Sequence, residues 1–104
     1  MITNPSSYSF TPPSDVSLVT HYAVTVHTVS DFGTLASETL GPTATGHGFT
    51  DLMAQVLTGG HAGVECRLDV QAVGADGSSP LVASVDTFQF RPVPGPVSDI
   101  VVTP

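Results

Sequence analysis

The sequence contains no lysine and no tryptophan, and it has a single cysteine. Arg67 and Arg91 are its only arginines, and nine acidic residues give a formal net charge of −7. Proteins that bind nucleic acid or anionic membranes gain affinity from clustered lysine and arginine, which neutralise phosphate charge. The composition therefore argues against nucleic acid and membrane surfaces as partners.

The single cysteine, Cys66, cannot form a disulfide within the chain. It lies in the run GVECRLDVQAV, where alternation places it on the same face of an expected strand as Leu68 and Val70. A nucleophilic cysteine needs a base and positively charged surroundings, and this run offers neither. We therefore expect Cys66 to pack in the core.

Long apolar runs are also missing. No run approaches the roughly 18 residues of a membrane-spanning helix, and the opening residues, MITNPSSYSF, lack the basic and apolar regions of a secretion signal. We expect neither a targeting segment nor a membrane helix. The length of 104 residues suits one domain with one modest core.

What the sequence does contain is typical of strands and turns. Only 11% of the residues are charged, and valine, threonine, serine and glycine recur together with nine prolines, a mixture that favours an all-β protein. A change of apolar parity near Asp86 predicts a bulge or a twist, and Asp76-Gly77 predicts a hairpin turn. The expected strands are residues 7–11, 21–29, 34–40, 43–50, 64–73 and 81–90.

One stretch breaks this pattern. Residues 51–57, DLMAQVL, are good helix formers, and Gly59-Gly60 follows them. We expect a short inserted helix there, capped at its start by Thr50 or Asp51.

The histidines do not form a recognisable metal site. His21 and His27 are expected on the polar outer face of one strand, roughly 20 Å apart at about 3.3 Å per residue. His47 and His61 flank the expected helix without a second pair of ligands at zinc spacing. No nucleophile motif or phosphate-binding loop is present, so we expect no enzyme activity, no cofactor and no metal.

Two segments carry a resemblance to a known family. YSFTPPSD followed by VTHYAVTVHT resembles the second and third strands of fibronectin type III domains, and CRLDVQAVGADGSSPLVASV resembles their sixth and seventh strands. The resemblance covers roughly residues 7–90 and implies a Greek-key β-sandwich related to the immunoglobulin-like folds. Phe10 stands where this family usually has a core tryptophan, and Cys66 stands where it has a corner tyrosine.

The resemblance accounts for no first strand at the N-terminus, because only MITNP precedes the segment that resembles the second strand. The C-terminal run PGPVSDIVVTP resembles a linker and a first strand of this family. We therefore expect a sandwich domain at residues 1–91, and a proline-rich linker with a displaced strand at residues 92–104. This strand would complete the same sandwich or a neighbouring one, with a frayed tail as the remaining alternative. Its expected interacting residues are Val97, Ile100, Val101 and Val102.

These features predict a non-enzymatic structural or adhesion module. The resemblance and the absence of a signal favour a phage capsid or tail decoration protein, located in the virion, which self-associates or binds a capsid or tail protein. The alternative is a fragment of a bacterial extracellular or cell-surface protein that binds protein or carbohydrate. Tyr8 and Phe32 are the aromatic residues expected at the surface for such contacts.

Overall fold

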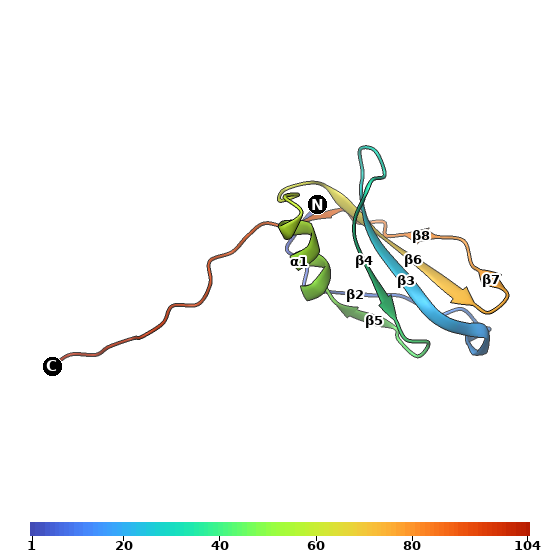
Figure 1. The fold of residues 1–104 in the computed structure, drawn as a ribbon, viewed down its shortest axis with the longest axis horizontal. Helices are drawn as coiled ribbons and strands as arrows, with labels where there is room; N and C mark the ends of the chain where they lie inside the picture. The colour runs from blue at the N-terminus through green and yellow to red at the C-terminus, as the bar shows by residue number, and fades with distance from the viewer.

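The structure is a computed structural model and describes residues 1–104. Strands dominate it, and the prediction of an all-β protein with one short inserted helix is confirmed (Figure 1). In chain order the elements are β1 (Ile2–Thr3), β2 (Ser7–Ser9), the 3-10 helix η1 (Val16–Leu18), β3 (Val19–Thr28), β4 (Thr34–Leu40), β5 (Gly46–Gly48), α1 (Thr50–Thr58), β6 (Cys66–Gly74), β7 (Gly77–Ser78), β8 (Val82–Ala83) and β9 (Phe88–Gln89).

The larger sheet has the strand order β1-β9-β6-β3-β4, and β7 and β8 also pair with β6. All of its pairs are antiparallel except β1 with β9, which is parallel. Between β8 and β9 the pairing is interrupted near Asp86, as the parity change predicts. Ser84 fills the interruption: its N–H donates to the Leu68 carbonyl at 2.7 Å, and its hydroxyl accepts from the Leu68 N–H at 3.1 Å.

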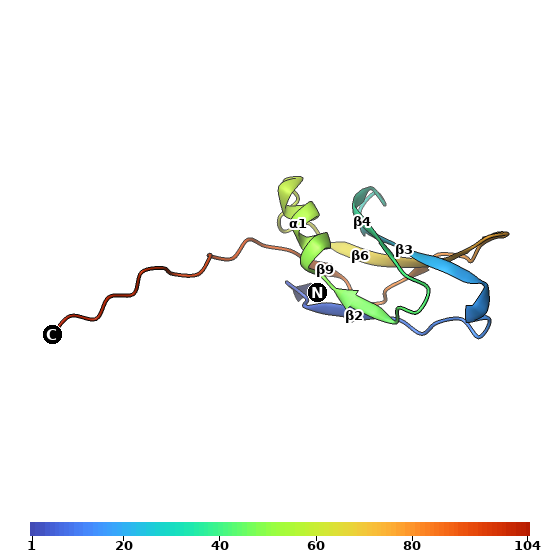
Figure 2. The ribbon, with the colours of Figure 1, turned by 60° about the horizontal axis from the view of Figure 1, so that its bottom comes forward.

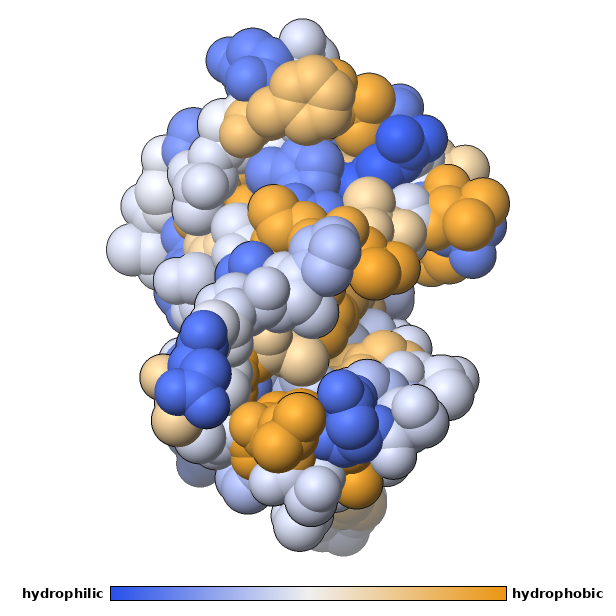
Figure 3. Space-filling view, turned by 90° about the vertical axis from the view of Figure 1, so that its right-hand side faces the viewer, coloured by the Kyte–Doolittle hydropathy of each residue, from blue (hydrophilic) through white to orange (hydrophobic).

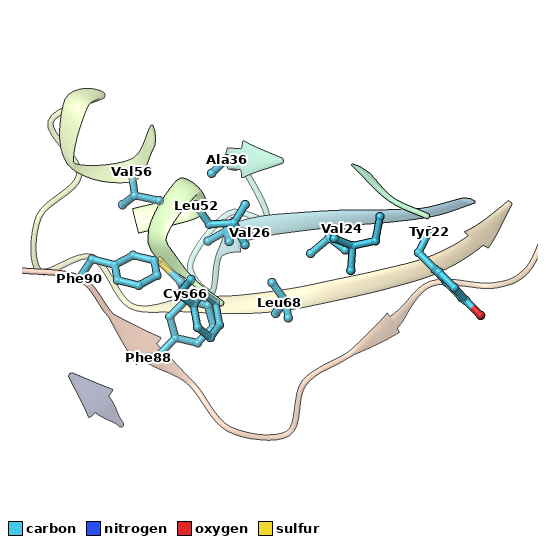
Figure 4. Packing of buried hydrophobic residues seen from close by; sticks show 12 residues of the cluster. Tyr22, Val24, Val26, Ala36, Leu52, Val56, Cys66, Leu68, Phe88 and Phe90 are labelled. Carbon is cyan, nitrogen blue, oxygen red and sulfur yellow. The ribbon is translucent and has the colours of Figure 1, made fainter. Parts of the chain in front are cut away.

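The second sheet contains β2 and β5 only, and it lies across one face of the larger sheet (Figure 2). The core fills the space between the two sheets and under α1 (Figure 4). Tyr22, Val24 and Val26 of β3 are at most 1% exposed, and Cys66 of β6 is completely buried. The predicted core faces of β3 and β6 are confirmed, because alternate residues of a strand point to the same side.

Three phenylalanines occupy the end of the core nearest α1. The ring of Phe49 lies 5.2 Å from that of Phe88 and 5.6 Å from that of Phe90, at tilted or edge-to-face angles that suit aromatic pairs. Phe90 is completely buried. It is the last buried residue of the chain and fixes the point at which the C-terminal segment leaves the domain.

The helix α1 begins and ends close to the predicted residues, and Leu52 and Val56 bury its inner face. The predicted cap is wrong. The helix begins one residue earlier, with Phe49 at the N-cap position and no side-chain cap bond, so Thr50 and Asp51 lie inside the first turn. At nine residues α1 is short, and no helix of the structure has the length and apolar character to cross a membrane.

The N-terminus supplies an edge strand that the sequence analysis did not expect. The Ile2 N–H donates to the Thr87 carbonyl at 3.0 Å, and the Asn4 N–H donates to the Gln89 carbonyl at 2.9 Å. The side chain of Asn4 closes this ladder, accepting from the Arg91 N–H at 2.8 Å and donating to the Arg91 carbonyl at 3.1 Å. The expectation that MITNP contributes no strand is therefore wrong, because these residues pair with β9.

Beyond Arg91 the chain forms no strand and no helix, and residues 92–104 are exposed throughout. This C-terminal arm extends away from the domain at the end where α1 lies (Figure 1). It pairs with no strand of its own chain, so the structure differs from the arrangement in which the arm completes its own sandwich.

Candidate interaction surface

A groove of about 570 Å³ opens between the two sheets, and most of its lining is apolar. Tyr22, Leu68, Val70 and Ala72 of β3 and β6 line it, together with Phe10 after β2 and Val82 of β8. Figure 3 looks onto the end of the molecule where β7 lies and shows apolar surface in the recess between the two parts of this face. None of the lining residues is charged, although the chain carries a net charge of −7.

One side of this groove is bordered by a strand with an unpaired edge. β2 pairs with β5 alone, through the register Tyr8↔His47. Outside the strand bounds, the Phe10 N–H donates to the Thr45 carbonyl and the Phe49 N–H to the Ser6 carbonyl. In an antiparallel pair, alternate residues turn their backbone groups to opposite sides. The N–H and C=O groups of Ser7 and Ser9 therefore point away from β5, toward an edge that no strand of this chain occupies.

Two edges of the larger sheet lack this feature. The amide of Gln55 in α1 accepts from the Ser37 N–H at 3.1 Å and donates to the Ser37 carbonyl at 2.9 Å, which covers the outer edge of β4. Exposed strand edges promote pairing with other chains unless they are covered or kept very short. β4 is covered by a helix and β1 has two residues. β2 and β5 each have an edge that no strand occupies, and the edge of β2 lies beside the apolar groove.

One residue that lines the groove carries a buried polar group without a partner in the chain. The hydroxyl of Tyr22 is buried without a hydrogen bond, while the residue as a whole is 1% exposed. In Figure 4 its oxygen lies at the end of the cluster opposite Val56 and Phe90 and points away from the other labelled side chains. Buried hydroxyl groups nearly always have a partner, because an unmade bond costs about 1–3 kcal/mol. No group of this chain therefore offsets the burial of the Tyr22 hydroxyl.

The polar groups on the opposite wall already have partners. The Ser79 hydroxyl accepts from the Ala72 N–H at 3.0 Å and lies 3.1 Å from the Pro80 carbonyl, to which it donates. The Ser84 hydroxyl accepts from the Leu68 N–H and donates to the Asp86 carbonyl at 3.0 Å. Polar contacts offered to an incoming group thus come from the edge of β2, since the Tyr22 hydroxyl is buried.

The C-terminal arm exposes the residues that are expected to act in strand donation. Val97 and Ile100 are each 81% exposed, Val101 is 78% exposed and Val102 is 91% exposed. No side chain of the domain covers them. The sequence of this segment, VSDIVV, is rich in β-branched residues that favour strands.

Tyr8 does not form the open aromatic surface that the sequence analysis expected. Its ring is half-buried and lies 5.1 Å from that of Phe49, and its hydroxyl donates to a carboxylate oxygen of Glu38. His47 Nδ1 lies 3.4 Å from the same Glu38 oxygen. Burial and the neighbouring Glu38 raise the pKa of Tyr8 far above its ordinary value. This cluster ties β2 and β5 to β4 and is a structural contact between the sheets.

Phe32 is the exposed aromatic residue that the sequence analysis expected, with 75% of its surface accessible. It has a positive φ of 59° and stacks on His27 at 5.7 Å. His27 itself is buried, with Nε2 3.1 Å from the Asp69 carboxylate and Nδ1 3.1 Å from the Thr28 carbonyl. The expectation that His27 lies on a solvated outer face is wrong, because Phe32 covers it and Asp69 faces it across the sheet.

No other cluster suggests chemistry. The structure has no place where three or more histidine, cysteine or acidic side chains converge. Cys66 is buried with its thiol 3.1 Å from the Val64 carbonyl, and burial raises the pKa of this thiol. The prediction that Cys66 packs in the core is confirmed. Comparison of the chain with protein-family models, curated proteins and solved structures finds no match.

The groove was not anticipated from the sequence. Phe10, Leu68 and Val82 lie in three separate expected strands. Only the pairing of the strands brings them to one opening. Only the C-terminal arm could be predicted as an interaction segment from its own sequence, because apolar residues follow its prolines.

Proposed function

We propose that this protein is a non-enzymatic structural module that joins a repetitive protein surface through its C-terminal arm. The domain would be a Greek-key sandwich of the fibronectin type III kind, and the setting that the sequence features favour is a phage capsid or tail, with the protein as a decoration or stabilising subunit of the virion. Its partners would be further copies of itself or a capsid or tail protein.

The observation that carries this proposal is the exposed arm. Four large apolar residues in a six-residue stretch, Val97, Ile100, Val101 and Val102, are 78–91% exposed and contact no part of the domain. Isolated apolar side chains at a surface are common, but a contiguous group usually marks an interaction site. Their β-branching suits addition to the edge of a sheet, where backbone hydrogen bonds supply much of the affinity.

The low charge of the surface agrees with a structural role. Only 11% of the residues are charged, and no charged group lines the groove. Interfaces between copies are depleted of charge at their centres. A module of this kind can pack against many identical neighbours with little loss of solvation for charged groups.

A deletion tests the proposal. Residues 92–104 make no hydrogen bond with the domain, and Arg91, which Asn4 holds, is retained in a chain that ends at residue 91. We expect this deletion to abolish concentration-dependent assembly, measured by sedimentation velocity or native mass spectrometry, and to leave the thermal midpoint of the monomer within a few degrees. Unchanged assembly after the deletion would refute the proposal.

The alternative, a carbohydrate- or protein-binding module of a bacterial extracellular protein, retains one observation in its support. Phe32 is exposed at the tip of a loop with a positive φ, a conformation that is uncommon for a bulky residue and often found at contact sites. Tyr8 does not add a second stacking face because its hydroxyl is engaged with Glu38. Binding on a glycan array that Phe32→Ala removes would favour this alternative.

A further inference from the structure

We propose that the groove beside β2 is the acceptor site for the C-terminal arm of a second copy of this chain. This inference rests on the proposed function and adds to it a site and a mode of binding. The incoming segment, residues 97–102, would pair with the free edge of β2 and place its apolar side chains over Phe10, Tyr22 and Val82.

The dimensions of the two parts agree. A six-residue strand spans roughly 20 Å at about 3.3 Å per residue, and the bordering segment from Ser9 through Pro13 would span roughly 16 Å if extended. Ser7 and Ser9 offer backbone groups that lack partners. An added strand would satisfy these groups and cover the apolar lining in one step.

The charges of the two parts also agree. Two copies that each carry a net charge of −7 repel one another in general. The groove lining has no charged residue, and the segment 97–102 has Asp99 alone. Contact through these two surfaces therefore brings few like charges together.

The position of Asp99 decides which face of the segment points inward. In an extended strand Asp99 shares a face with Val97 and Val101, and the opposite face carries Ile100 and Val102. Burying an unpaired carboxylate in an apolar groove is strongly unfavourable. Ile100 and Val102 therefore face the groove, and Val101 faces solvent.

The arm is better placed for a neighbour than for its own domain. It leaves at Arg91, beside α1, whereas the groove includes residues of β8 and the segment between β7 and β8 at the other end (Figure 1). Pro92, Pro94 and Pro96 alternate through its first part, and such sequences favour stiff, extended conformations. The linker thus carries residues 97–102 outward.

The free arm is not yet a regular strand, because Asp99 has a positive φ of 54°. This residue would move to the extended region when the segment docks.

The test uses two full-length variants that each remove one side of the contact. Val82→Glu places a charge in the acceptor groove at a position that is 69% exposed, and its matched control is Val85→Glu, at 90% exposure and outside the groove. Ile100→Glu with Val102→Glu removes the donor face, and its matched control is Val101→Glu. Circular dichroism verifies that each variant is folded.

We expect Val82→Glu and the donor double variant each to weaken self-association at least tenfold in sedimentation equilibrium, while both controls stay within about threefold of the wild type. Mixing the Val82→Glu chain with the donor double variant should restore a 1:1 dimer in native mass spectrometry, because one chain retains an intact donor and the other an intact acceptor.

The outcomes separate this inference from the proposed function. If deleting residues 92–104 abolishes assembly but Val82→Glu and Val85→Glu behave alike, the arm docks elsewhere and only the acceptor site is refuted. If the donor double variant lowers the thermal midpoint of a monomer and mixing yields no dimer, the arm closes on its own domain and the intermolecular contact is refuted. If the wild type remains monomeric and the deletion changes nothing, both proposals fail.

Discussion

The side-chain amide of Gln55 pairs with the backbone N–H and C=O of Ser37, at 3.1 and 2.9 Å. It occupies the outer edge of β4 in the way that a neighbouring strand would. A single side chain of α1 thus closes an edge of the larger sheet, and the helix that interrupts the strand pattern of the sequence has a clear structural role.

We expect Gln55→Ala to lower the free energy of unfolding by about 1 kcal/mol, because two hydrogen bonds of modest net value are lost at a partly solvated site. Urea unfolding measures this change. Hydrogen exchange at the Ser37 amide should become faster. Thr58→Ala, an exposed change at the end of the same helix, is the control. Equal protection of Ser37 in both variants would show that Gln55 does not cover this edge.

The two tyrosines should respond to loss of their hydroxyl groups with opposite signs. Tyr22→Phe removes a buried hydroxyl without a partner and should raise the free energy of unfolding by about 1 kcal/mol, whereas Tyr8→Phe removes a bond to Glu38 and should lower it by about 1 kcal/mol. Both are measured in the background of Ile100→Glu with Val102→Glu, so that association does not contribute. A stability loss in both variants would show that the Tyr22 hydroxyl has a partner in the free chain.

The ionisation of the Tyr8 hydroxyl at alkaline pH should reflect its buried position. Its pKa is raised above the ordinary value of about 10 by burial and by Glu38. The unfolded chain releases this proton first, so the stabilising contribution is complete below pH of about 10 and declines as the pH rises further. The tyrosinate absorbance that Tyr8→Phe removes should therefore develop well above pH 10 in the native protein. An ordinary midpoint for this absorbance would contradict the buried contact with Glu38.

Cys66 should be inert in the folded protein. It is completely buried, and burial raises the pKa of its thiol, so little reactive thiolate forms near neutral pH. A thiol reagent such as Ellman's should react at a rate set by unfolding, and the rate should rise sharply across the denaturant transition. Rapid reaction under native conditions would mean that β6 opens locally around Cys66.

The parts of the fold that follow a periodic pattern could be predicted from the sequence. β3 and β6 alternate over nine or more residues, so the burial of Val24 and Cys66 followed from parity. The helix was predicted because α1 contains good helix formers before two glycines. Both the alternation and the helix propensity are properties of a single segment, so each element can be predicted without knowing its contacts.

The parts that depend on contacts between distant segments could not be predicted. β1 has two residues, which is too short for any periodicity, and its parallel pairing with β9 depends on Asn4 bonding to Arg91. The burial of His27 depends on Phe32 turning back over it through a positive φ. The groove between the sheets has no signal in any single segment, since segments distant in the sequence line it.

The two hydrogen bonds between the Asn4 side chain and the Arg91 backbone lie where the C-terminal arm begins. They have a mechanical consequence for a chain of linked copies. Tension on the arm would reach the domain at Arg91, directly after the buried Phe90, and would pull β9 along its own axis against the parallel β1. The hydrogen bonds of that pair would be strained together in shear, instead of opening one after another. The same arrangement that ties the N-terminus to the arm would thus let the domain transmit force between neighbours without unravelling from its end.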